Sequence, residues 1–238
     1  WRRTYFPELS LLQISTTSKI LLIDHLSIKS LGFLKEILED TKKMIIIHSS
    51  RSDTTVLNTN LNINLKNIFD IQIAEKYLSG GEIKNYGSLV HKYLGLEINK
   101  SETNSNWLKR PLSDKQLDYA SNDVNFLIPI FQSQKKILKR NKMMNEIILQ
   151  SKKEADLGNQ QLHVSRVKKL KNSSDKEKEI FLWREKQARD QNVPPSYIFE
   201  DRFLKKITKD LKNKNISKEK IKKYFRDSAV AYDFIVQM

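Results

Sequence analysis

Short apolar runs, each bounded by polar residues, constrain the fold of this chain more than any other feature. Residues 19–23 and 44–47 have the length of buried strands, and no apolar run is long enough to cross a membrane. Residues 9–24 show two strand-like segments around a turn at residues 16–18, which predicts a hairpin. We therefore expect a folded domain with buried strands and no membrane partner.

Helical periodicity alternates with the strand pattern and indicates the fold class. It predicts strands at 44–48 and 67–70, and helices near 31–39, 53–60, 71–78 and 86–94. Ser52 is the predicted cap of the helix over 53–60. A long helix is expected to begin at the capping box Ser113-Asp114-Lys115-Gln116 and to run to about Lys139. This order predicts an α/β layer fold, with a mixed sheet flanked by helices.

Both pattern and charge change in the last third of the chain. The periodicity weakens around Gly158-Asn159-Gln160-Gln161, which predicts a linker over residues 151–164. Beyond it only helical patterns follow, at about 174–191, 199–212 and 217–226. Residues 151–238 hold 22 of the 43 basic and 13 of the 28 acidic residues, a net charge of +9. We predict an α/β domain over residues 1–150 and a small, basic, all-helical domain over residues 165–238.

The net charge of +15 bears on the partner of the chain. A basic chain is attracted to phosphate-rich partners without any reading of base sequence. The abundance of Asn, Lys and Ile is also what an AT-rich genome produces by codon drift, so charge alone leaves both explanations open. The absence of cysteine excludes a disulfide framework and a cysteine zinc site.

Tyr119 and Asp123 lie four residues apart on the predicted long helix, so their side chains share one face. A carboxylate can bind a divalent cation and a phenol can position a water, which together suit metal-assisted hydrolysis. A tyrosine–aspartate pair at this spacing is more often a simple surface contact. From the residues alone, both interpretations stay open.

Three further polar residues lie at the ends of predicted strands. Asp53 follows the strand at 44–48, at a position where α/β proteins commonly place their sites. The same residue could instead serve only to stabilise the first turn of the next helix. His48 could be a ligand or a packing residue, and Asp70 could cap the helix that follows it.

Several segments, in order, resemble ribonuclease D of the DEDD exonuclease superfamily. They are Thr4–Ile14, Leu22–Asp24, His48–Asp53, Ile68–Ala74, Lys100-Ser101 with Trp107–Leu112, and Gln116–Val124. Their order and spacing over residues 1–135 carry the resemblance, rather than any single segment. It implies a ribonuclease H-like DEDD exonuclease fold for the first domain.

In this family four acidic residues hold two divalent cations, Mg²⁺ or Mn²⁺. The resemblance assigns Asp53 and Asp123 to two of these positions, and Tyr119 to orientation of the attacking water. The other two acids belong to an Asp-x-Glu motif that the family's spacing puts just ahead of Trp1. We therefore expect an N-terminally truncated fragment that is nearly inactive. One departure is Asn106, where the family usually has Asp before the tryptophan.

The second domain resembles the HRDC domain, a helical nucleic-acid-binding module found in ribonuclease D and RecQ helicases. The resemblance rests on Leu182–Glu185, Ala188, Asn192–Pro194, and Asp201 with Leu204. We expect this domain to bind nucleic acid through basic side chains on one face, and the candidates are Lys168, Lys169, Lys205, Lys206, Lys209 and Lys222.

The resemblance implies a 3′→5′ exoribonuclease that releases nucleoside 5′-monophosphates from RNA by two-metal hydrolysis. Family analogy points to tRNA precursors as the RNA partner, and we expect a cytoplasmic monomer. The alternative is a non-catalytic RNA- or DNA-binding protein that retains the exonuclease fold.

Overall fold

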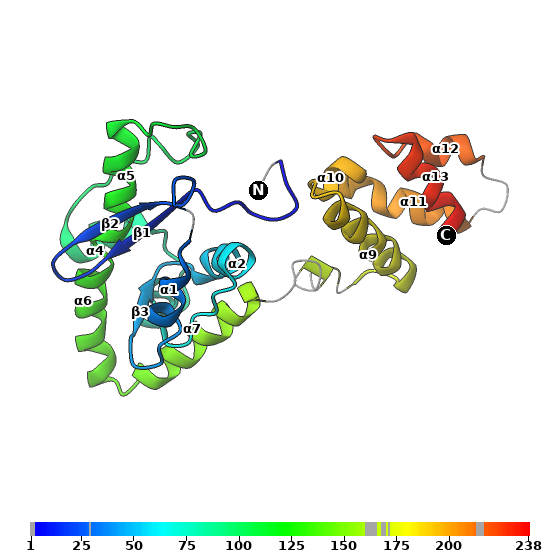
Figure 1. Cartoon of the computed structure of the whole chain (residues 1–238). Helices are drawn as coiled ribbons and strands as arrows, with labels where there is room; N and C mark the ends of the chain where they lie inside the picture. The colour runs from blue at the N-terminus through cyan, green and yellow to red at the C-terminus, as the bar shows by residue number, and fades with distance from the viewer. Residues whose placement is uncertain (1–2, 29, 160–165, 168–169, 171, 213–216) are drawn as a thin grey trace. The chain divides into compact units, whose positions relative to one another are not determined.

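Two pairs of short strands form the sheet layer in the computed structural model, which describes residues 3–28, 30–159, 166–167, 170, 172–212 and 217–238. Strands β1 (Leu11–Ser15) and β2 (Ile20–Asp24) pair antiparallel, as the predicted hairpin requires. Strands β3 (Ile45–Ile47) and β4 (Ile68–Asp70) pair in parallel. The predicted mixed α/β class is therefore confirmed, with the sheet present as two two-stranded pieces (Figure 1).

Contacts divide the chain into two units, which differ from the predicted domains of residues 1–150 and 165–238. One unit is Leu9–Asn159, and the other combines Trp1–Glu8 with Gln160–Met238. The predicted linker over 151–164 begins too early, because helix α7 (Met144–Asn159) extends into it as far as Asn159 and packs on helix α2 (Ser50–Leu61). The remainder of that linker, residues 160–164, lies outside the described residues.

The other described helices of the first unit are α1 (Gly32–Leu38), α3 (Ile71–Leu78), α4 (Tyr86–Leu94), α5 (Asp114–Asn125) and α6 (Leu127–Arg140). The predictions for α3 and α4 are confirmed at both ends. Each helix starts at a side-chain cap, because Asp70 accepts from the backbone N–H of Gln72 and Asn85 accepts from that of Ser88. The predicted capping box at Ser113 is also present.

Two predicted helices begin or end elsewhere. Helix α2 starts at Ser50 instead of after Ser52, because its first N–H groups are bonded by a side chain distant in sequence, described below. The predicted long helix is interrupted at Phe126. Pro129 explains the break, since it has no N–H to donate to the carbonyl of Asn125 and its ring crowds that carbonyl.

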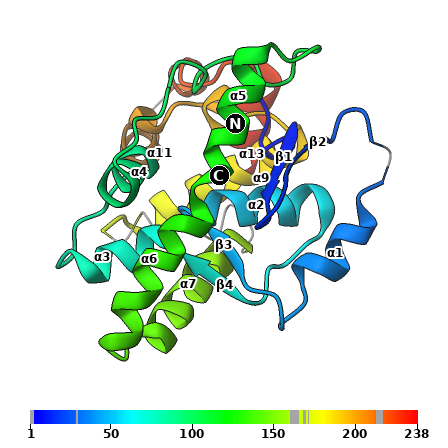
Figure 2. The ribbon, with the colours of Figure 1, turned by 90° about the vertical axis from the view of Figure 1, so that its left-hand side faces the viewer.

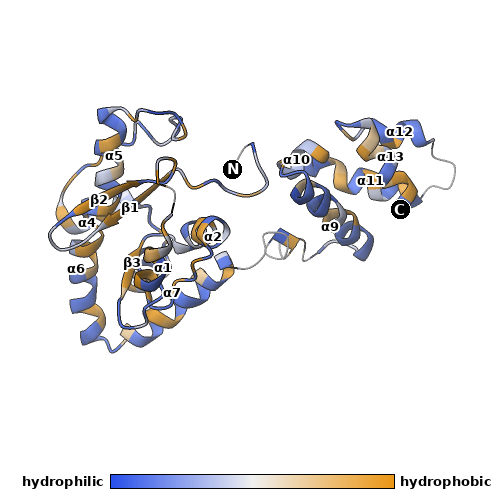
Figure 3. Ribbon diagram, in the orientation of Figure 1, coloured by the Kyte–Doolittle hydropathy of each residue, from blue (hydrophilic) through white to orange (hydrophobic). Residues whose placement is uncertain are grey.

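Apolar side chains build two cores within this unit. One gathers helices α3 to α7 about Phe69 and Ile130, and the other joins α1 and α2 to the strands about Leu34 and Ile68. Figure 3 shows apolar residues concentrated along the strands and on one side of the helices. Figure 2 shows α7 beside β4, where the backbone N–H of Asp70 donates to the hydroxyl of Ser151.

Helices are the only regular secondary structure in the described residues of the second unit. Its elements are α9 (Asp175–Asp190), α10 (Pro195–Ile198), the short 3-10 helix η2 (Asp201–Phe203), α11 (Leu204–Lys212), α12 (Lys218–Lys222) and α13 (Ser228–Gln237). The helix predicted over 199–212 is split, because Phe199 is extended and ends α10. No helix of either unit, within the described residues, is long and apolar enough to span a membrane.

Helices α2 and α7 approach so closely that Gly158 has no space for a side chain. A Cβ there would lie 2.4 Å from the carbonyl oxygen of Arg51 and 2.0 Å from Oγ1 of Thr54. The hydroxyl of Thr55 donates to the carbonyl of Gly158 at 3.0 Å, and Arg51 pairs with Glu154 at 2.7 Å. This crossing fixes α2, the helix that carries Asp53.

We predict that Gly158→Ala lowers the free energy of unfolding of this unit by about 1–3 kcal/mol, since the backbone of α2 must shift. Alanine is a better helix former than glycine, so helix propensity alone would predict that Gly158→Ala raises the free energy of unfolding. Urea unfolding followed by circular dichroism measures the change. Gly32→Ala is the control, because a Cβ there meets nothing nearer than 3.7 Å. Equal stability of the two variants would contradict the close-packed crossing.

Candidate active site

The site begins with Asp70, a buried carboxylate at the end of β4. Its Oδ1 accepts from the backbone N–H groups of Ser49 at 3.1 Å and Gln72 at 2.9 Å, and its Oδ2 accepts from that of Ser50 at 2.8 Å. Its own N–H donates to Oγ of Ser151 on α7 at 2.9 Å. Asp70 therefore ties the first turns of α2 and α3 to the ends of both parallel strands, and its role is structural.

Asp53 lies in the first turn of α2, where the partial positive charge of a helix N-terminus favours a carboxylate. It is not the cap, since Asp70 bonds the first N–H groups. Its side chain reaches solvent, yet enough protein surrounds it to remove part of its hydration. This loss of hydration, followed by the negative charges of Asp70 and Asp123, raises the pKa of Asp53 to about 6.

Asp123 is half-buried in the last turn of α5. Loss of hydration raises the pKa of its carboxyl to about 6. Tyr119 lies one turn earlier on the same helix face. The structure thus brings Asp123 within electrostatic reach of Asp53, although the two residues are far apart in the chain.

Within the described residues, neither Asp53 nor Asp123 has an ion pair or a hydrogen bond, whereas most other acids of this unit do. Two carboxylates within electrostatic range of each other, with raised pKa and no cationic partner, form a donor set that a divalent cation would stabilise. The described residues contain no group of three acidic or histidine donors. The two carboxylates therefore fit a cation that binds two protein oxygens and completes its coordination shell with water or phosphate oxygens.

The loop before α5 surrounds Tyr119 on two sides. The ring of Trp107 lies 5.8 Å from the ring of Tyr119, centre to centre. The hydroxyl of Tyr119 lies 3.2 Å from Oγ1 of Thr103. The indole N–H of Trp107 donates to the carbonyl of Glu102, which fixes the ring within the loop. These contacts restrict the rotation of the phenol.

Arg110 clamps this loop to the hairpin. Its Nε and Nη2 donate to the two carboxylate oxygens of Asp24, each at 2.7 Å, in a bidentate pair. Nη2 also donates to the carbonyl of Ser10, and Nη1 donates to that of Trp107. Sequence reasoning missed this pair, because the two residues are 86 positions apart and each looked like an ordinary polar residue at the end of an element.

The other sequence candidates lie elsewhere. His48 lies 3.2 Å from the carbonyl of Lys84, and burial lowers the pKa of its imidazole, so packing explains it. Lys205, Lys206 and Lys209 are exposed on α11. The remaining lysine of the described candidates, Lys222, pairs with Glu219, while Lys168 and Lys169 lie outside the described residues.

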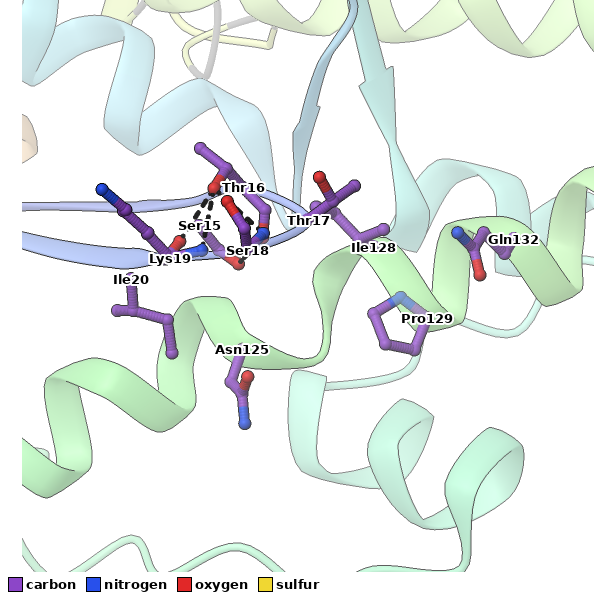
Figure 4. A pocket seen from close by; sticks show the side chains of 10 residues that line it. All are labelled: Ser15, Thr16, Thr17, Ser18, Lys19, Ile20, Asn125, Ile128, Pro129 and Gln132. Carbon is purple, nitrogen blue, oxygen red and sulfur yellow. Dashed lines mark hydrogen bonds between the residues drawn. The ribbon is translucent and has the colours of Figure 1, made fainter.

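A hollow of about 610 Å³ lies between the hairpin turn and the junction of α5 and α6 (Figure 4). Its lining includes Thr16, Ser18, Asn125 and Gln132. None of Asp53, Tyr119 and Asp123 lines it, so the candidate site is the carboxylate pair rather than this hollow.

Comparison with known proteins identifies the family of the chain. The family model for the 3′-5′ exonuclease matches residues 2–139, and that for the HRDC domain matches residues 177–227. The chain therefore belongs to the 3′-5′ exonuclease family. The curated relatives that the chain matches are named ribonuclease D.

The ribonuclease D of Desulfotalea psychrophila is 33% identical over 248 residues, covering 95% of this chain and 65% of the relative. The solved Escherichia coli RNase D has a TM-score of 0.77 at 21% identity, covering 98% of this chain and 66% of that one. Brucella melitensis NrnC with bound Mg²⁺ has a TM-score of 0.58 at 21% identity, covering 71% of this chain and 81% of that one. The chain spans between a third and two thirds of the length of the curated relatives it matches.

Asp24 gives a prediction for acid stability. The Arg110 guanidinium, through its hydrogen bonds, holds the pKa of the Asp24 carboxyl well below its usual range. A depressed pKa adds stability above the unfolded value of about 3.9, and this stability is lost as the pH falls through and below it. Asp24→Asn should therefore cost about 1–2 kcal/mol at pH 7 and progressively less below pH 4.

Urea unfolding from pH 7 to pH 3 measures this difference. Asp40→Asn is the matched control, because Asp40 pairs with Lys43 at the surface, where such pairs contribute little. A difference between wild type and Asp24→Asn that stays constant with pH would show that the ion pair does not stabilise the fold.

Proposed function

We propose that this chain is a metal-dependent 3′→5′ exoribonuclease that shortens RNA from its 3′ end to nucleoside 5′-monophosphates. The observation that carries the proposal is a pair of carboxyls with raised pKa, Asp53 and Asp123, of which Asp123 lies within electrostatic range of Asp53 and neither has a cationic partner among the described residues. Membership of the 3′-5′ exonuclease family supports it, as does the name ribonuclease D of the relatives. We further propose tRNA precursors as the substrate, following the analogy with that family.

Each residue of the site has a distinct part in this proposal. Asp53 and Asp123 would take part in holding two divalent cations, Mg²⁺ or Mn²⁺. Bound divalent cations lower the pKa of a water and stabilise the leaving oxygen of a phosphodiester. Tyr119 would orient the attacking water through its hydroxyl, which Trp107 and Thr103 keep in place. The Mg²⁺ in the NrnC structure supports a cation in this fold.

One observation favours a second candidate function. The described residues offer two carboxylates at the site and no group of three donors, fewer than two-metal chemistry uses. A non-catalytic protein that binds RNA or DNA and retains the exonuclease fold would need no more. With two carboxylates at the site, we expect weak cation binding and slow hydrolysis of RNA.

Cation binding tests the proposal. We expect Mn²⁺ titration calorimetry to show at least tenfold weaker binding in Asp53→Asn and in Asp123→Asn, since each variant removes one of two oxygen ligands. Asp118→Asn, an exposed acid on the same helix, is the control and should bind Mn²⁺ like the wild type. Unchanged Mn²⁺ affinity in both site variants would leave the non-catalytic alternative.

For Tyr119→Phe we predict a fall in the single-turnover rate on the order of 10- to 100-fold, with RNA affinity within about twofold of wild type. The hydroxyl acts on the attacking water, so its loss is felt mainly in the transition state. A 5′-labelled RNA read on sequencing gels gives both quantities. Tyr77→Phe, an exposed tyrosine on α3, is the control. Lost affinity with an unchanged rate would make Tyr119 a substrate contact instead.

The basic helical unit should add affinity for nucleic acid without strong sequence preference. Lys205, Lys206 and Lys209 are exposed on α11, and their joint replacement by Gln should make the salt dependence of RNA binding shallower. Each phosphate contact contributes a log–log slope of about −0.7 for single strands. Replacement of Lys136, Lys139 and Lys142 by Gln removes equal charge from the other unit. If both triple variants change the slope of the salt dependence equally, the lysines of α11 form no special binding face and contribute only general positive charge.

A further inference from the structure

The helical unit contains a short segment from the opposite end of the chain. Tyr5 is only 2% exposed and belongs to the core that includes Phe181, Trp183 and Phe199. Its ring meets the ring of Phe6 edge-on at 5.0 Å. Tyr5 is far from these residues in sequence but packs in the same core. The groove that it fills is therefore part of the folded helical unit.

Polar contacts fix the same segment. The Tyr5 hydroxyl donates to Oε2 of Glu185 at 3.0 Å, and Glu185 is 1% exposed. Arg166 donates to the same carboxylate oxygen at 2.8 Å, and its guanidinium lies 4.8 Å from the centre of the Tyr5 ring. Oδ1 of Asn192 accepts from the backbone N–H groups of Tyr5 and Phe6, at 3.2 and 3.3 Å. The helical unit therefore binds both the Tyr5 side chain and the backbone of the segment.

Through the Glu185 carboxylate, the segment stabilises the unit. A buried carboxylate is costly unless donors satisfy it, and the other oxygen, Oε1, has no hydrogen-bond partner among the described residues. Tyr5 supplies one of the two donors to Oε2 and also shields the carboxylate from solvent. Without the segment, Glu185 would keep Arg166 and the core would lose a large aromatic side chain.

We propose that the helical domain carries a binding groove for an aromatic turn, Tyr-Phe-Pro, and that residues 3–8 of this same chain are its resident ligand. The groove is made by α9, Arg166 and Asn192, which follows the C-cap of α9 and is left-handed, with φ of 48°. The folded helical domain therefore includes the N-terminal segment, and the chain passes between the two units twice. This inference does not depend on the proposed function.

Hydrogen exchange of the full chain, read by mass spectrometry, tests the groove. Tyr5→Ala should accelerate exchange in α9 and α10 by at least tenfold and leave α3 and α5 unchanged. Tyr5→Phe removes only the hydroxyl, keeps the core filled, and should accelerate the same helices several-fold. A peptide of sequence Arg-Thr-Tyr-Phe-Pro-Glu, matching residues 3–8, should restore protection to Tyr5→Ala at millimolar concentration.

The matched control is Tyr93→Phe. Tyr93 donates to Glu75 at 2.7 Å, and Glu75 is 0% exposed, so the same type of bond is lost inside the other unit. This variant should accelerate α3 and α4 and spare α9. The proposal is overturned if Tyr5→Ala leaves α9 and α10 protected, if it accelerates α3 and α5 equally, or if the peptide restores nothing.

Discussion

The buried carboxylate of Asp70 is the constraint on which the site depends. It is 0% exposed, and a charge at that depth is tolerated only because three backbone N–H groups from two helices donate to it. Those bonds start α2 directly at the end of β3, which puts Asp53 in the first turn. The same charge also raises the pKa of Asp53, so one residue sets both the position and the electrostatics of the site.

Arg110 plays the equivalent part on the other side of the site. Its bidentate pair with Asp24 and its bonds to Ser10 and Trp107 hold the loop before α5 against the hairpin. The loop in turn restricts Tyr119. The carboxylate pair and the phenol are therefore held by two polar networks, each formed by residues that have no part in the proposed chemistry.

Local chemistry decided which features could be predicted from the sequence. The ends of helices α3 and α4 agree with the prediction, because the side chain that caps each helix, Asp70 or Asn85, directly precedes it in the sequence. The start of α2 and the core position of Tyr5 depend on partners 20 and 180 positions away, which no local pattern reveals. Pro129 itself indicates a break in the long helix, but the helical periodicity of the apolar residues continues across it and favoured a single helix. Asp53, Tyr119 and Asp123 emerged as a set only through the family resemblance.

Anomalous diffraction from crystals soaked in Mn²⁺ would show whether Asp53 and Asp123 hold a divalent cation together. We predict a peak with carboxylate oxygens of both residues at roughly 2.1 Å and water completing the shell. Soaking Asp123→Asn crystals in the same way should abolish that peak. A cation bound at other residues, or two carboxylates that turn away from each other with no density between them, would show that Asp53 and Asp123 do not form a cation site.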